Sequence, residues 1–214
     1  MTAPEIIWRP NDDFLTNSNI ARFMRKNGIP DYRALLAWSV EDIRLFWTAL
    51  LEDMNIDWYK PYDELLDLSG GFPWAKWFAG GETNIVLNCL DRHIVAGRGE
   101  RTLLVWEGDG GEVRRLTYGA FAAEVSRLAG AMRAMGMKPG DFAGIYMPMI
   151  PETVMAMFAC FKTGVAAIPI FSGFGPEAVA ERLAHAGARL LFTADGGFRR
   201  GKETPVKKTV DEAL

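Results

Sequence analysis

The chain has 214 residues, a net charge of −3 and 24% charged residues, values that are ordinary for a globular protein. So small a net charge argues against nucleic acid or an anionic membrane as a partner. No apolar run reaches the ~18 residues of a membrane span, and Met1–Arg9 lacks the basic start and apolar core of a secretion signal. We therefore expect a cytoplasmic protein.

The cysteines and histidines predict neither a disulfide nor a metal site. Cys89 and Cys160 are far apart in apolar contexts, so we expect two buried thiols in a reducing compartment. His93 and His185 are isolated, and no His, Cys and carboxylate cluster occurs at metal-ligand spacing.

The first part of the chain is rich in helix signals and tryptophan. Residues 17–27 carry apolar side chains on one face, and residues 84–96 show a weaker helical pattern. Ser39, with Asp42 three residues later, resembles a capping box at the start of a stronger helix. We expect residues 1–100 to form an α-rich N-terminal region. The apolar stripe of the stronger helix, which we interpret as packing, comprises Ile43, Phe46, Trp47, Leu50, Leu51 and Met54.

From residue 101 onward the pattern changes to strands. Two apolar runs on either side of Gly108-Asp109-Gly110-Gly111 indicate a hairpin, and Thr117 then caps a helix. Strands and helices afterwards alternate at the spacing of right-handed βαβ units, which predicts an α/β fold with a mostly parallel sheet. The expected strands are 142–146, 165–170 and 190–193, and the expected helices are 152–162, 176–186 and 205–214.

Two loops carry the strongest indication of a binding site. Residues 171–175 and the glycine-rich, basic residues 195–202 each follow an expected strand, an order in which α/β proteins present backbone N–H groups to a phosphate. Between Arg189 and Lys208 there are six cations and two acids, a local charge of +4. We expect one anion-binding surface, with a solvated basic loop as the alternative. The candidate residues are Ser172, Gly173, Arg199, Arg200, Gly201 and Lys202.

Two short motifs in these loops suggest other nucleotides. Gly173-Phe174-Gly175 begins a G-x-G-x-x-A pattern, and Asp195 follows about 20 residues later, which keeps an NAD(P)-binding half-domain as an alternative. Gly196 to Lys202 matches G-x-x-x-x-G-K, but Glu203 stands where a Walker A loop needs Ser or Thr. A carboxylate there would repel phosphate, so we exclude an NTPase loop.

Several longer strings together resemble the AMP-forming acyl-CoA synthetases, and within that adenylate-forming superfamily the acetyl-CoA synthetase branch. The similarity runs in order from about Trp38 to Leu214. By this resemblance the chain is identified as the N-terminal portion of such an enzyme, with residues 101–214 as the incomplete first part of its large AMP-binding domain. The strings include Trp77-Phe78-Ala79-Gly80-Gly81, Asn88-Cys89-Leu90-Asp91-Arg92-His93, Tyr146-Met147-Pro148-Met149-Ile150-Pro151-Glu152 and Thr193-Ala194-Asp195-Gly196-Gly197.

The resemblance implies a ligase that converts a carboxylic acid (acetate or another short acid) and ATP into an acyl-adenylate and pyrophosphate, and then transfers the acyl group to CoA. The partners would be these small molecules. In that family the loop occupied here by residues 199–202 holds the 3′-phosphate end of CoA, and the loop occupied by residues 171–174 lies near the CoA nucleotide. This sequence has Lys202 where the family has arginine and Ser172 where it has glycine.

The resemblance also places the ATP loop, the Mg²⁺ site, the acyl pocket and the catalytic lysine of the family beyond Leu214. We therefore expect no catalytic residue in this chain, which would be inactive alone while it carries part of the CoA site. An uncovered sheet edge and apolar face lead us to expect self-association. A stand-alone module that binds CoA or another nucleotide is the second alternative.

Overall fold

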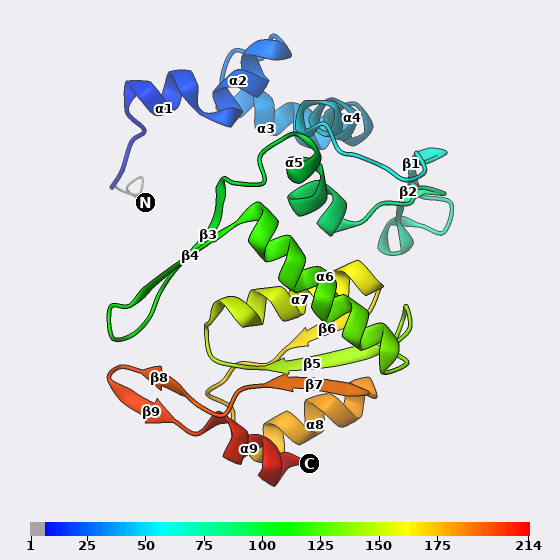
Figure 1. Ribbon diagram of the computed structural model, residues 1–214. Coiled ribbons are helices and arrows are strands. Elements are labelled where there is room, and N and C mark those ends of the chain that lie inside the picture. Colours follow the sequence, from blue (N-terminus) through cyan, green and yellow to red (C-terminus); the bar gives the residue numbers. More distant parts are fainter. Residues whose placement is uncertain (1–6) are drawn as a thin grey trace, which may run out of the picture. The chain divides into compact units, whose positions relative to one another are not determined.

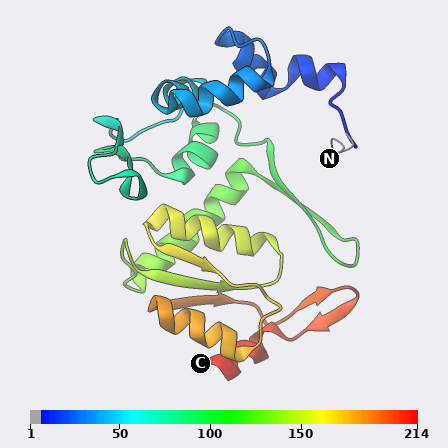
Figure 2. The same ribbon diagram turned by 180° about the vertical axis from the view of Figure 1, so that it is seen from behind.

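The computed structural model describes residues 7–214 (Figures 1 and 2). The chain divides into two compact units, one that ends at Thr83 and one that runs from Asn84 to Leu214. A division into two domains near residue 100 stays a prediction. Within the described residues, no helix is both long enough and apolar enough to cross a membrane.

The first unit consists of short helices followed by an antiparallel pair of strands. A side-chain oxygen caps the start of each helix; Ser18 accepts from the N–H of Ala21, and Asp31 accepts from the N–H of Ala34. The elements are α1 (Asp12–Asn17), α2 (Asn19–Lys26), α3 (Tyr32–Glu41), α4 (Ile43–Met54), β1 (Glu64–Asp67), a 3₁₀ turn (Phe72–Trp74) and β2 (Lys76–Ala79).

The predicted capping box at Ser39 is wrong. Ser39 lies inside α3, where its hydroxyl donates to the Leu36 carbonyl. The helix break falls at Asp42, whose backbone leaves the helical region (φ −132°, ψ 81°) and whose carboxylate accepts from the N–H of Leu45. Asp42 is therefore the N-cap of α4 itself. Asp42 thus ends α3 and starts α4, whereas the sequence pattern predicted one helix that begins at Ser39 and no helix at residues 32–38.

The apolar stripe of α4 is part of an aromatic cluster, as the packing interpretation expected. Phe46 lies 5.5 Å from Trp38 of α3, and Trp47 lies 5.4 Å from Trp77 of β2, measured between ring centroids. The ring planes make angles of 83° and 61°, respectively, in the edge-to-face arrangement that aromatic quadrupoles favour. Trp38, Trp47 and Trp77 thus serve packing, whereas Trp8 and Trp74 are exposed.

The second unit is built on a parallel sheet of strand order β6-β5-β7, which confirms the predicted α/β fold. Helices α6 and α7 lie on one face of this sheet, and α8 and α9 lie on the other (Figure 1). The elements are a π-helical turn (Leu87–Asp91), α5 (Arg92–Val95), β3 (Thr102–Glu107), β4 (Val113–Thr117), α6 (Tyr118–Ala134), β5 (Phe142–Tyr146), α7 (Pro151–Thr163), β6 (Ala166–Pro169), α8 (Pro176–Ala186), β7 (Leu190–Thr193), β8 (Gly197–Arg199), β9 (Lys202–Thr204) and α9 (Val206–Ala213).

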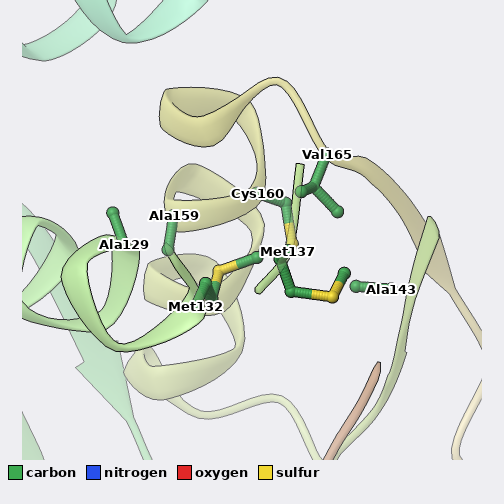
Figure 3. Close-up of a cluster of buried hydrophobic side chains, with 7 residues drawn as sticks. All are labelled: Ala129, Met132, Met137, Ala143, Ala159, Cys160 and Val165. Carbon is green, nitrogen blue, oxygen red and sulfur yellow. The ribbon is translucent and has the colours of Figure 1, made fainter. Parts of the chain in front are cut away.

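Small side chains let α6, α7 and the central strand approach closely (Figure 3). Ala129 of α6, Ala159 of α7 and Ala143 of β5 are all buried, so the backbones of these elements can come near one another. The cluster drawn in Figure 3 consists of Ala129, Met132, Met137, Ala143, Ala159, Cys160 and Val165.

On the other face, Gly144 in the middle of β5 allows α8 to pack against the sheet. A Cβ atom at this position would collide with the Leu183 side chain of α8 and would come within 2.8 Å of Leu191 in β7. The glycine is therefore favoured by packing, and its backbone is ordinary extended strand.

The cysteines differ from the expectation of two buried thiols. Cys160 is fully buried in α7, but Cys89 in the π-helical turn is exposed. The weak apolar pattern of residues 84–96 did not show which face of this segment is covered, because part of it is π-helical and the helical period does not apply there.

The two thiols should differ in reactivity. Burial raises the pKa of the Cys160 thiol to about 11, so little thiolate forms there in the folded protein. At about pH 8, Ellman's reagent should modify one thiol per chain rapidly and the second only after unfolding in denaturant. The Cys89→Ser variant should leave no fast thiol. Rapid labelling of Cys160 in the folded Cys89→Ser variant would contradict the burial of this residue.

Candidate anion-binding site

The expected glycine-rich loop after β7 is in fact a β-hairpin. Strands β8 and β9 pair antiparallel around the two-residue turn Arg200-Gly201, and both turn residues have positive φ values, 54° and 71°. Two-residue hairpin turns of type I′ need this backbone, which glycine adopts freely and arginine adopts at a cost. The glycines and the dense charge of residues 196–202 concealed two strands of only three residues each.

The hairpin has two chemically different faces. Arg199 is paired with Lys202, and Phe198 is paired with Glu203. Cross-strand partners point to the same face, while successive residues alternate, so the two cations share one face and Phe198 and Glu203 share the other. Of the predicted candidates, Arg199 and Lys202 are therefore neighbours, and Arg200 and Gly201 form the turn between them.

The second predicted loop lies against the cationic face. The guanidinium carbon of Arg199 lies 5.1 Å from the centroid of the Phe171 ring. At Gly173 an added Cβ would approach the Arg199 Nη1 atom to 3.2 Å and would collide with Phe171. Phe174 lies edge-on to Phe171, with 5.7 Å between the ring centroids. The two loops therefore converge as expected, through a guanidinium held over an aromatic ring.

Sequence reasoning missed the group that holds this second loop. Tyr146, at the carboxyl end of β5, is 1% exposed. Its hydroxyl lies 3.0 Å from the carbonyl oxygen of Ser172 and 2.8 Å from that of Phe174, and it donates its one proton to either. Ser172 thus contributes its backbone to an internal contact. A buried tyrosine needs a polar partner, but the sequence did not show where that partner would lie.

The backbone N–H groups of the hairpin already have partners inside the protein. The N–H groups of Arg200 and Gly201 donate to the two carboxylate oxygens of Asp109, and the Arg200 bond is 3.2 Å long. The N–H of Gly196 donates to the carboxylate of its neighbour Asp195 at 2.8 Å. The expectation that this loop offers its N–H groups to a phosphate is therefore wrong at these three positions. An anion at this site would meet side chains, above all Arg199.

Asp109 belongs to the tip of the β3–β4 hairpin, and both hairpins extend from the same side of the sheet (Figures 1 and 2). A cavity of about 560 Å³ lies between them. Its carboxylates would repel a phosphate, whereas the cations of β8–β9 lie on the opposite face of that hairpin. The cavity is lined by Trp106, Glu107, Gly108, Asp109, Glu112, Pro148, Met149, Ile150, Asp195, Gly196, Gly197, Phe198 and Glu203.

The β3–β4 hairpin is fixed to the body of the second unit at two points. The indole N–H of Trp106 donates to the Met149 carbonyl at 2.6 Å. The Arg114 guanidinium donates to both oxygens of Glu152, in the first turn of α7, at 2.6 and 3.1 Å. This bidentate hydrogen bond from Arg114 lowers the pKa of the Glu152 carboxyl.

Comparison with known proteins places the chain in the family of AMP-binding enzymes, whose sequence pattern matches residues 91–214. The pattern of the acetyl-coenzyme A synthetase N-terminus matches residues 32–89. The chain belongs to the AMP-binding enzyme family, which confirms the resemblance seen in the sequence.

Individual relatives agree with this family. The chain is 47% identical to the acetyl-coenzyme A synthetase of Mycobacterium tuberculosis H37Rv over 184 residues, which are 85% of this chain and 28% of that protein. It is 40% identical over 214 residues to the enzyme of the same name from Burkholderia lata, covering 100% of this chain and 32% of that one. The solved acetoacetyl-CoA synthetase from Streptomyces lividans has a similar structure, with a TM-score of 0.88 at 28% identity over 98% of this chain and 33% of that chain. The chain thus spans about a third of the length of these relatives.

The contact between Arg114 and Glu152 predicts a pH-dependent stability difference between the wild type and Glu152→Gln. The pKa of Glu152 is lowered in the folded protein, so its contribution is present above the ordinary value of 4.5 and is lost as the pH falls through the folded value. Because the pair is half exposed, we expect the substitution to lower the free energy of unfolding by about 0.2–1 kcal/mol at neutral pH. Urea unfolding at about pH 7 and about pH 3 measures the difference, which should vanish at the lower pH.

Glu177 supplies a matched control, because it also lies in the first turn of a helix, α8, and has no ion pair among the described residues. Glu177→Gln removes a favourable interaction with the helix dipole without breaking a bond to arginine. If Glu152→Gln lowers the free energy of unfolding no more than Glu177→Gln does, the contact with Arg114 contributes nothing to stability.

Proposed function

We propose that this chain forms the N-terminal part of an AMP-forming acyl-CoA ligase and contributes part of its CoA site. In this reaction a carboxylic acid and ATP yield an acyl-adenylate and pyrophosphate, and CoA then displaces AMP. The names of the relatives, acetyl-coenzyme A synthetase and acetoacetyl-CoA synthetase, support the use of CoA and of a short acid. The enzyme would act on small molecules in the cytoplasm.

The observation that carries the CoA assignment is the convergence of Arg199 with the loop 171–175, while Lys202 is paired with Arg199 across the hairpin. The Phe171 ring orients the guanidinium of Arg199, which can then donate two parallel hydrogen bonds to the oxygens of a phosphate. Lys202, on the same face of the hairpin, adds a point charge that neutralises the second negative charge of a phosphate monoester. This arrangement suits the 3′-phosphate of CoA.

The rings of Phe171 and Phe174, 55% and 37% accessible, each lie beside a guanidinium, that of Arg199 at Phe171 and that of Arg182 at Phe174. Aromatic rings next to cations are a surface on which a nucleotide base can stack while its phosphates are neutralised. The combination favours a nucleotide with a terminal phosphate over an inorganic anion.

No finding favours the alternatives of a stand-alone CoA module or an NAD(P)-binding half-domain. For a dinucleotide the pyrophosphate would have to dock at the start of α8. There Pro176 has no N–H to donate, and Glu177 places a carboxylate in the first turn. A Cβ added at Gly175 would meet no atom within 4 Å, so packing does not demand the last glycine of the motif.

ATP, Mg²⁺ and the acid need residues that we do not assign here. The part of the chain that the structure describes has no group of three or more His, Cys, Asp or Glu residues that could hold a metal ion. We propose that the residues for these substrates correspond to the remaining length of the relatives. We assign no catalytic residue to this chain.

The CoA assignment predicts a selective effect of Arg199→Ala in a ligase that carries this chain. A charge-assisted contact to an exposed phosphate contributes ~1.5–3 kcal/mol, so the KM for CoA should rise about tenfold or more. Acid-dependent ATP–pyrophosphate exchange should stay near wild type, because adenylation does not use CoA. Dephospho-CoA, which lacks the 3′-phosphate, should be used equally well by the wild type and the variant.

Lys208→Ala supplies a control for the loss of a cation, since Lys208 lies on α9 within 3.9 Å of Glu212. It should leave the KM for CoA unchanged. An unaltered CoA dependence in Arg199→Ala would make Arg199 an ordinary solvated charge and would remove the support for the CoA site.

The 214-residue chain alone should also self-associate. Among the described residues β6 and β7 each pair with β5 alone, so both leave an open edge of backbone N–H and C=O groups. An apolar hollow of about 390 Å³, lined in part by Leu128, Met155 and Phe192, adds an uncovered surface. Sedimentation at about 10–50 μM should show concentration-dependent association, and a clean monomer there would contradict this proposal.

A further inference from the structure

The contact between Asp109 and the turn of the β8–β9 hairpin joins segments that are 91 residues apart in the chain. We propose that Asp109 is a positioning residue, which holds the hairpin so that Arg199 and Lys202 face the loop 171–175. The consequence for CoA binding depends on the proposed function, but the positioning itself does not.

The hairpin cannot supply its own rigidity. Its strands have three residues each, and an isolated hairpin of this size is at best marginally stable in water. The turn also places Arg200 at φ 54°, a backbone region that residues with a side chain adopt at a cost. Contacts outside the hairpin must therefore hold its tip in place.

The base of the hairpin is fixed by the body of the second unit. A Cβ added at Gly197 would approach Pro148 to 2.8 Å, so the chain passes closely beside this proline. Beyond β9, the N–H of Lys207 donates to the Asp195 carbonyl at 3.1 Å and closes the base. These contacts lie at the base of the hairpin and do not restrain its tip, where the cations lie.

Asp109 supplies the missing contact at the tip. Its two carboxylate oxygens accept from the successive N–H groups of Arg200 and Gly201. Neighbouring N–H groups of such a turn form a small concavity that binds anions, and hydrogen bonds to a carboxylate are among the stronger ones. The carboxylate of Asp109 occupies the place that an external anion would otherwise take.

Asp109 is itself held rigidly. Its turn is closed by hydrogen bonds from Gly108 N–H to the Glu112 carbonyl at 2.8 Å and from Gly111 N–H to the Gly108 carbonyl at 2.9 Å. The strands behind this turn are tied to the unit through Trp106 and Arg114. A fixed carboxylate can therefore restrain a flexible partner.

Removal of the Asp109 carboxylate should change the affinity for CoA in opposite directions, depending on whether Asp109 acts only through its charge or positions the hairpin. The Asp109 carboxylate is bonded to the turn between Arg199 and Lys202 and lowers the positive potential that attracts a phosphate. Its removal should therefore tighten CoA binding if its charge is the only effect. If Asp109 orients the hairpin, its removal should weaken binding because Arg199 and Lys202 lose their common direction. The sign of the change thus separates the two roles.

The decisive experiment compares Asp109→Ala and Asp109→Asn with the control Glu112→Ala in the 214-residue chain. Ala removes both acceptors, Asn keeps one, and Glu112 lies on the same hairpin and lines the same cavity. Amide hydrogen exchange at Arg200 and Gly201, followed by NMR, should be fastest in Asp109→Ala, intermediate in Asp109→Asn and unchanged in the control. Unchanged exchange in Asp109→Ala would overturn the proposal.

Calorimetric titration of CoA and dephospho-CoA tests the consequence. We expect Asp109→Ala to bind CoA about threefold or more weakly, to bind dephospho-CoA like wild type, and to show no further loss when combined with Arg199→Ala. Tighter CoA binding in Asp109→Ala would overturn the positioning role in favour of simple charge repulsion. If the wild type does not distinguish CoA from dephospho-CoA, the proposed CoA site fails, and the exchange data still decide the role of Asp109.

Discussion

The pairing of β5 with both β6 and β7 is the constraint on which the second unit depends. Both helix layers pack against this three-stranded sheet, and each layer meets a small residue on β5, Ala143 on one face and Gly144 on the other. The same strand ends in Tyr146, whose hydroxyl bonds to the loop after β6. The candidate site therefore lies where it does because the carboxyl ends of parallel strands meet at one edge of the sheet.

The site consists of groups that restrain one another before any ligand is considered. Arg199 is oriented by an aromatic ring, the turn beside it by the carboxylate of Asp109, and the neighbouring loop by Tyr146. Such restraint lowers the entropy that would be lost when a phosphate binds, so a small number of exposed cations can be sufficient. The cavity on the opposite face of the hairpin is lined by carboxylates, which would repel a phosphate. The two faces of the hairpin therefore differ in charge, and only the cationic face suits this ligand.

Much of the fold was predictable because its signals are local. Thr117 caps α6, Pro151 occupies the first position of α7, and the predicted strand 142–146 coincides with β5. The errors arose where a helix boundary depended on a single residue and where strands were very short. Asp42 ends one helix and starts the next, and the hairpin at residues 197–204 reads as a loop because its strands are too short for an alternating pattern to be recognised.

The sequence by itself determined the alternation of strands and helices, the family, and the identity of the cations at the candidate site, since these depend on periodicity and on strings of neighbouring residues. Only the tertiary structure decided which groups meet: Asp109 with the turn at Arg200, Tyr146 with the loop carbonyls, and Arg199 with the ring of Phe171. These contacts join residues that are 26 to 91 positions apart, and no local pattern records them. Their partners are set by strand order and by the close packing that follows from it.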